Sequence, residues 1–161
     1  MKKKVYLIRH AQSEANAALD LDNPTFYYDA RLTHLGKEQT LKTRKKLVNV
    51  NFDLMISSPL TRTLQTFSLV FPQPIKNTIV LPLAREHLDH SCDVGRQPEI
   101  LKKEFPHFNL STLKKFWWNN DKFINEKTIN QESVENLDVR VKKFKKWIYE
   151  RDENTIAVVS H

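Results

Sequence analysis

The sequence predicts a three-layer α/β/α fold with a mostly parallel central sheet. Four short runs of apolar and β-branched residues are continuous rather than alternating, which is typical of strands buried on both faces. Segments with helical periodicity lie between these runs, and strands that alternate with helices indicate a parallel sheet. The 161 residues, 40% of them hydrophobic and 28% charged, are enough for one domain with its own core.

The first strand is expected over residues 4–8 (KVYLI), directly after a cluster of lysines. A short helix follows it, and Ser13 or Asn16 is suited to cap that helix. Behind a polar loop, a second helix is expected over 32–48. The weak inner face of this helix consists of Leu35, Leu41, Leu47 and Val48.

A second buried strand is expected over residues 52–57 (FDLMIS). Ser58 and Pro59 then predict a helix start, with serine as the N-cap and proline at the first helical position. A third strand is expected over 78–81 (TIVL), after two prolines have ended the helix. The inner face of the helix consists of Leu60, Leu64, Phe67 and Phe71.

The second half of the chain begins with an irregular segment over 84–125 that contains short helical pieces around 98–105 and 111–118. A long amphipathic helix is expected over 133–151, before a fourth buried strand over 155–160 (TIAVVS). The inner face of the long helix consists of Val134, Leu137, Val141, Phe144 and Ile148.

Polar side chains with shared chemistry follow the ends of all four predicted strands. In open parallel sheets, ligands bind at the carboxyl ends of the strands, so we expect these side chains to meet at one edge. They are Arg9 and His10 after the first strand, Arg62 after the second, Arg85, Glu86 and His87 after the third, and His161 after the fourth.

Arginines and histidines that face one crevice make an anion site, and the planar fork of arginine suits phosphate. A neutral imidazole is a competent nucleophile toward phosphorus, and the positive field of Arg9 and Arg62 favours a neutral His10. A glutamate at the rim can protonate the leaving oxygen and later take a proton from water. Because the arginines neutralise the phosphoryl group, this chemistry calls for no metal and no cofactor.

Residues 7–16 (LIRHAQSEAN) resemble the signature of the histidine phosphatase superfamily, also called phosphoglycerate mutase-like. Further blocks resemble the family in its own order, and the chain is most similar to the RHAQ-type phosphatases. These blocks are 32–39 (LTHLGKEQ), 56–66 (ISSPLTRTLQT), 83–96 (LAREHLDHSCDVGR) and 156–161 (IAVVSH).

The resemblance implies a role for each matching residue. His10 is expected to be the nucleophile that becomes phosphohistidine, and Glu86 the general acid and base. Arg9, Arg62 and His161 are expected to bind the phosphoryl group. Further substrate contacts are expected from Asn16, Arg85 and Arg96, together with His87 at the mouth of the pocket.

The sequence departs from the family pattern in two places. Ala11 stands where the family has a glycine after the nucleophile, and the chain ends at His161, where relatives continue. The resemblance therefore implies one phosphoglycerate mutase-like domain over 1–161 that lacks the usual C-terminal segment and is truncated after the second catalytic histidine. Residues 84–125 are expected to form a helical insertion on the substrate side.

Three functions remain open from the sequence. The first is a metal-independent phosphomonoesterase that works through phosphohistidine, the second is a phosphoglycerate mutase-type phosphoryl transfer, and the third is a catalytically impaired module that binds phosphorylated ligands. The net charge of +7 suits a phosphorylated small molecule or a phosphoprotein as the substrate. The sequence does not indicate an oligomeric state.

Other function classes find little support. The basic stretch 140–147 (RVKKFKKW) places its lysines on one helical face, which indicates a solvated amphipathic helix rather than a nucleic-acid site. The segment 87–93, with its lone Cys92, lacks paired zinc-ligand spacing, and a single cysteine forms no internal disulfide. No apolar run suits a membrane helix or a signal peptide, so the sequence predicts a cytoplasmic protein without membrane or nucleic-acid partners.

Overall fold

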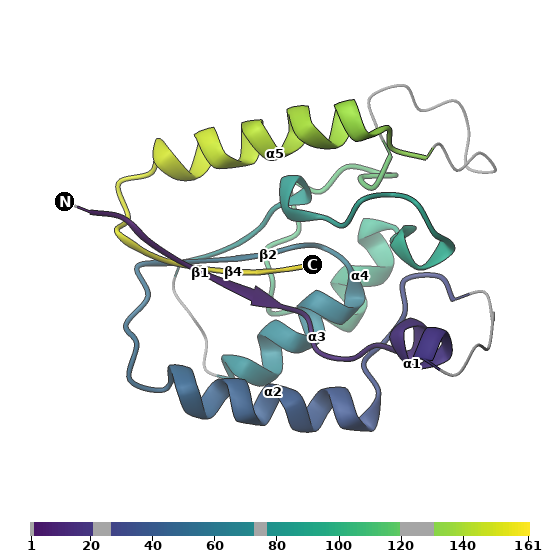
Figure 1. The fold of residues 1–161 in the computed structure, drawn as a ribbon, viewed down its shortest axis with the longest axis horizontal. Coiled ribbons are helices and arrows are strands. Elements are labelled where there is room, and N and C mark those ends of the chain that lie inside the picture. Colours follow the sequence, from purple (N-terminus) through teal and green to yellow (C-terminus); the bar gives the residue numbers. More distant parts are fainter. Residues whose placement is uncertain (1, 21–26, 73–76, 120–130) are drawn as a thin grey trace.

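The computed structural model describes residues 2–20, 27–72, 77–119 and 131–161. Within them, four strands form one parallel sheet in the order β1-β4-β2-β3. The strands are β1 (Lys4–Arg9), β2 (Leu54–Ser57), β3 (Thr78–Val80) and β4 (Thr155–Ser160). The prediction of a parallel α/β sheet is confirmed, and the carboxyl ends of the strands lie at the same edge (Figure 1).

Helices cover both faces of the sheet, so the predicted three layers are present (Figure 1). Helix α5 (Val134–Tyr149) packs on one face through a cluster that includes Ile148 and the strand residues Ile56 and Val158. Helices α2 (His34–Leu47) and α3 (Thr61–Val70) lie on the other face, where Leu64 packs with Val159. Leu64 and Phe67 of α3 and Leu60 just before it are buried, as the periodicity predicted, whereas Phe71, predicted on the same face, is only partly buried.

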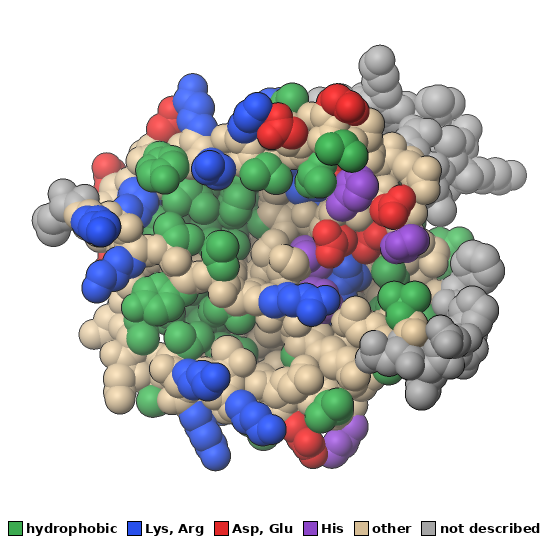
Figure 2. All heavy atoms as spheres, viewed as in Figure 1, with side chains coloured by type: hydrophobic (Ala, Val, Ile, Leu, Met, Phe, Trp, Pro, Cys, Tyr) green, Lys and Arg blue, Asp and Glu red, His purple; other side chains and the backbone are tan. Residues whose placement is uncertain are grey.

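Strand β1 differs from the prediction of burial on both faces. Leu7 is 77% exposed and Val5 is 40% exposed. The strand lies at one edge of the described sheet, and these side chains point away from the core. Figure 2 shows hydrophobic side chains gathered on this surface, between lysine and arginine side chains on either side.

The inner faces expected for the two long helices are partly wrong. Leu35 and Leu41 of α2 are about half exposed, at 47% and 49%, and the helix is buried at Gly36 and Thr40 instead. A Cβ at Gly36 would lie 2.2 Å from the carbonyl oxygen of Gln12, so the backbones approach more closely than a side chain allows. In α5, Val134 and Val141 are exposed, whereas Arg140 is buried.

Helix α3 begins later than predicted, and Ser58 is not its N-cap. The helix starts at Thr61, after Leu60 as the N-cap residue. Asp29, a buried carboxylate from a distant loop, accepts hydrogen bonds from the Thr61 backbone nitrogen (2.7 Å) and hydroxyl (2.6 Å). The carboxylate supplies the negative charge that a helix N-terminus favours, so the Ser58 hydroxyl is available elsewhere.

The segment after β3 contains two 3-10 turns, η1 (Pro82–Ala84) and η2 (Ser91–Asp93), and helix α4 (Pro98–Glu104). The helix expected around 111–118 is wrong, because these residues form turns. They are held there by Trp117, which is buried against Gly95 and donates to the carbonyl oxygen of Arg96 (2.9 Å). Among the described residues, no helix has the length and apolar character needed to cross a membrane.

Candidate active site

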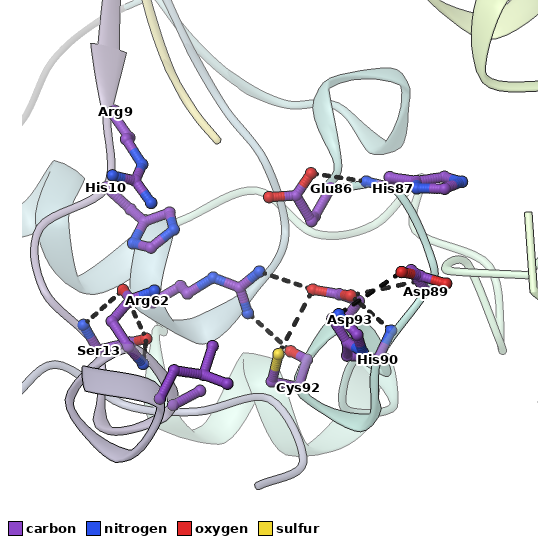
Figure 3. A pocket seen from close by; sticks show the side chains of 13 residues that line it. Arg9, His10, Ser13, Arg62, Glu86, His87, Asp89, His90, Cys92 and Asp93 are labelled. Atoms are coloured by element: carbon purple, nitrogen blue, oxygen red, sulfur yellow. Dashed lines mark hydrogen bonds and ion pairs between the residues drawn. The ribbon is translucent and has the colours of Figure 1, made fainter. Parts of the chain in front are cut away.

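A pocket of about 240 Å³ lies at the carboxyl end of β1, where the loop after η1 and the turn η2 approach α1 (Glu14–Asp20). Its two arginines and His10 come from the carboxyl end of β1 and the start of α3, whereas its carboxylates, together with His87 and His90, come from the opposite loops (Figure 3). The residues that line it are Arg9, His10, Ser13, Ala15, Asn16, Leu19, Arg62, Glu86, His87, Asp89, His90, Cys92 and Asp93.

His10 is buried at the end of β1 and held in one tautomer. Its Nδ1 lies 2.8 Å from the carbonyl oxygen of Ala11, and because a carbonyl only accepts, the proton is on Nδ1 and the lone pair on Nε2. The Ala11 nitrogen donates to Thr66 Oγ1 (3.1 Å), which anchors this backbone. Alanine in place of the family's glycine therefore still orients the imidazole.

The charge state of His10 follows from its surroundings. Burial, followed by the positive charges of Arg62 and Arg9, lowers the pKa of His10 from 6.5 to about 4. The imidazole is therefore neutral at pH 7, as the positive field predicted. A neutral ring with an available Nε2 lone pair is the nucleophilic form.

His161 lies beside His10, with ring centroids 5.1 Å apart. Its Nδ1 accepts from Arg62 Nη2 (3.3 Å), so Nε2 carries the proton and donates to Ser58 Oγ (3.0 Å). Burial and the nearby charge of Arg62 hold the pKa of His161 well below its ordinary value. Ser58 is a positioning partner for this histidine, which its expected capping role had obscured.

Arg62 is almost fully buried at the first turn of α3, with 3% exposure. Its Nη1 donates to the carbonyl oxygen of Cys92 (2.7 Å), and its Nη2 donates to Asp93 Oδ1 (3.1 Å). The buried Nε has no hydrogen-bond partner among the described residues. A buried donor without a partner is costly, so this nitrogen is suited to an anionic ligand.

Asp93 is the counter-charge that sequence reasoning missed. Its side chain is 5% exposed and forms an ion pair with Arg62. Asp93 Oδ2 also accepts from the His90 nitrogen (2.9 Å), which shapes η2. In the sequence, this aspartate stands out only as part of a segment with weak zinc-binding character. No spacing rule links it to an arginine 31 positions earlier. No group of three or more metal-ligating side chains occurs in the described parts of the chain.

Glu86 enters the pocket from the loop after η1 and lies across it from His10 (Figure 3). Its Oε1 accepts from the His87 nitrogen (2.8 Å), and its Oε2 lies 3.6 Å from His161 Nδ1. The side chain is 36% exposed, so water reaches the carboxyl group. This placement suits a group that exchanges protons with both a ligand and solvent.

Asn16 lines the pocket and also stabilises α1. Its Oδ1 accepts from the backbone nitrogen (3.0 Å) and hydroxyl (3.0 Å) of Ser13, while its own nitrogen donates to Ser13 Oγ (3.2 Å). This reciprocal capping pattern occupies the amide oxygen. The Nδ2 group remains as the donor that Asn16 could offer to a ligand.

Arg85 and Arg96, which were expected to touch the substrate, are not among the residues that line the pocket, and neither is His161. Arg85 is directed toward Glu132 (3.0 Å) and the carbonyl oxygen of Trp118 (3.1 Å). Arg96 donates to Thr61 and Glu104. Cys92 is partly exposed and lines the pocket, and partial burial raises the pKa of its thiol to about 11.

Comparisons with known proteins match this chain to one family. The sequence model described as the histidine phosphatase superfamily (branch 1) matches residues 5–161. Phosphoglycerate mutase-like protein 1 of Arabidopsis thaliana is 32% identical over 200 residues, covering 99% of this chain and 68% of that relative.

Solved structures of phosphatases are also similar to this chain. A putative alpha-ribazole-5'-P phosphatase from Escherichia coli is 27% identical with a TM-score of 0.65, over 98% of this chain and 73% of its own. The mycobacterial glucosyl-3-phosphoglycerate phosphatase, at 18% identity and a TM-score of 0.60, covers 99% of this chain and 74% of its own and shares the fold.

Proposed function

Because the chain belongs to the histidine phosphatase superfamily (branch 1), we propose that it is a metal-independent phosphomonoester hydrolase that works through a phosphohistidine on His10. The observation that carries this proposal is the neutral His10, whose Nε2 lone pair is available in a pocket that also contains Arg9, Arg62 and Glu86. One domain over 1–161 performs the reaction, and the segment 84–125, of which the structure describes residues 84–119, contributes its substrate side.

In the first step, His10 Nε2 attacks the phosphorus of the bound monoester. The N–P bond forms, the bond from phosphorus to the alcohol oxygen breaks, and Glu86 gives its proton to that oxygen. Arg9 and Arg62 stabilise the phosphoryl oxygens, and the partnerless Nε of Arg62 supports this role. His161 joins them when its Nε2 proton turns from Ser58 Oγ to a phosphoryl oxygen of the bound substrate. Asn16 adds a donor from its Nδ2 group.

In the second step, Glu86 acts as a carboxylate and takes a proton from water. The water oxygen attacks phosphorus, the N–P bond breaks, and inorganic phosphate leaves with His10 neutral again. The exposure of Glu86 supports hydrolysis rather than transfer to a second hydroxyl, because a mutase must keep water from its phosphohistidine. The mutase alternative shares these active-site residues, and the names of the plant relatives, which are called phosphoglycerate mutase-like, favour it.

The substrate class that fits is a phosphorylated small molecule, because the pocket has room for a phosphate and a modest alcohol. Neighbouring proteins whose names identify them as phosphatases support this class. The cytoplasmic compartment remains the prediction of the sequence.

The test is hydrolysis of p-nitrophenyl phosphate between pH 4 and 8 with a chelator present, comparing the wild type with His10→Ala. The matched control is His34→Ala, because the His34 side chain is 89% exposed on α2. We expect turnover that survives chelation, is lost by at least about 1,000-fold in His10→Ala and is unchanged in the control. Phosphate binding without turnover in the wild type would replace the proposal with a binding module.

A further inference from the structure

Three charged side chains that the proposed reaction does not use lie together behind the Glu86 loop, outside the pocket. They are Glu132, just before α5, Arg140 on α5, and Arg85 after η1. Their side chains are 1%, 7% and 8% exposed. Glu132 Oε1 accepts from Arg85 Nη2 (3.0 Å) and Arg140 Nε (2.8 Å), and its Oε2 accepts from Arg140 Nη2.

Arg140 uses its remaining donors on the backbone that carries Glu86. Its Nη1 donates to the carbonyl oxygens of Leu83 (3.1 Å) and Arg85 (2.8 Å), and its Nη2 donates to the carbonyl oxygen of Glu86 itself (3.2 Å). The planar guanidinium therefore sets the path of the loop that carries the proposed acid and base.

The backbone of Glu132 holds the next part of the same loop. Its nitrogen donates to the carbonyl oxygen of Leu88 (2.9 Å), and its carbonyl oxygen accepts from His87 Nε2 (2.6 Å). The positions on both sides of Glu86 are thus tied to the residue whose carboxylate also anchors Arg140.

The electrostatics make the Glu132 carboxylate the key member. Burial by itself would raise the pKa of Glu132, but the hydrogen bond from Arg140 and the charge of Arg85 hold it below the ordinary value. Among the described residues, Glu132 is the only carboxylate that forms an ion pair with Arg140. Without the negative charge of Glu132, Arg140 would be a buried cation with no counter-charge, and such a group moves toward water.

We propose that Glu132 is a positioning residue for Glu86: through Arg140 it holds the Glu86 carboxyl group where it can protonate the leaving oxygen. This inference rests on the proposed function, in which Glu86 performs that protonation. This positioning role differs from a purely structural one. A displaced Glu86 carboxyl group slows the reaction only of substrates whose leaving oxygen needs a proton.

The test compares kcat/KM for two monoesters, since this ratio reports on the first phosphoryl transfer. Glycerol phosphate has an alkoxide leaving group that needs a proton, whereas 2,4-dinitrophenyl phosphate has a phenolate that leaves without one. The variant is Glu132→Gln, which keeps the size and one acceptor but removes the charge. Glu104→Gln is the control, because Glu104 also pairs with two arginines and lies outside the pocket.

We expect Glu132→Gln to lower kcat/KM for the alkyl ester by about 10-fold or more and to leave the aryl ester within about twofold. Glu86→Gln should show the same selectivity, and the double variant should be no worse on the alkyl ester than Glu86→Gln alone. Arg140→Lys, which keeps the charge but loses the fork, should repeat the pattern if Glu132→Gln does not fold.

An equal loss on both esters, or additive losses in the double variant, would overturn the positioning role while leaving the proposed function intact. No loss on either ester would overturn it as well. A wild type that hydrolyses neither ester, or a His10→Ala variant that hydrolyses both, would instead refute the proposed function and the inference together.

Discussion

The ion pair between Arg62 and Asp93 yields a prediction in which stability and phosphate affinity change in opposite directions. The two side chains are 3% and 5% exposed, and their closest atoms lie 3.1 Å apart. Removing one partner of a buried ion pair costs about 3–5 kcal/mol because the other charge stays buried. Asp93→Asn keeps an acceptor, so we expect a smaller loss of about 2–3 kcal/mol in the free energy of unfolding.

For a chain of this size, that loss lowers Tm by roughly 5–10 °C. The same substitution leaves the Arg62 cation without its counter-charge, and a bound phosphate dianion then supplies it. Inorganic phosphate should therefore raise the Tm of Asp93→Asn by more than it raises that of the wild type.

The assay is thermal unfolding with and without phosphate, at constant ionic strength. Asp138→Asn is the control, because it removes an exposed carboxylate that pairs with Lys142 on α5. An unchanged Tm in the absence of phosphate would refute the reasoning on the buried pair. A smaller phosphate shift in Asp93→Asn than in the wild type would show that Asp93 serves mainly to orient Arg62.

Three further predictions follow from single features. The pKa of His10 is about 4 in the folded state and 6.5 in the unfolded state, so the unfolded state binds more protons between pH 4 and pH 6.5. The free energy of unfolding should therefore fall by up to about 3 kcal/mol as the pH drops from 6.5 to 4. Urea titrations at several pH values should show a weaker fall in His10→Asn. Gly36→Ala, which usually stabilises a helix by about 1 kcal/mol, should lower the urea midpoint here because its Cβ meets the carbonyl of Gln12, and a higher midpoint would contradict that packing. Arg96→Ala should lower Tm but leave KM for an aryl phosphate within about twofold, whereas a large rise in KM would restore its predicted contact with substrate.

The positions of the strands and the buried face of α3 were predictable from the sequence, because both depend on patterns within a short segment. The continuous apolar run 155–160 favours burial and forms the buried strand β4, whereas the similar run at the start of the chain forms the edge strand β1, in which Leu7 is exposed. The faces of α2 and α5 were less predictable, because a hydrophobic residue can remain exposed when the helix packs elsewhere. Gly36 and Arg140 are buried there, and hydropathy does not favour either of them.

The candidate site divides in the same way. His10 and Glu86 follow strand ends, and parallel strands bring those ends to one edge, so their meeting in one pocket followed from the order of elements. Asp93 and Ser58 were missed as partners of Arg62 and His161, because each contact joins residues far apart in sequence. The capping signal at Ser58 was misleading, since Asp29 occupies the helix start from another loop.

The sequence by itself determined the order of strands and helices, the resemblance to the family and the histidine at the end of the first strand, because these are properties of short, contiguous segments. Only the tertiary structure decided which arginine lines the pocket and which arginines hold loops in place. Arg62, Arg85, Arg96 and Arg140 carry the same guanidinium, yet one faces the pocket and the others hold loops. A cation's role depends on which carboxylates and carbonyl groups the fold brings within hydrogen-bond distance, and those partners come from elsewhere in the chain.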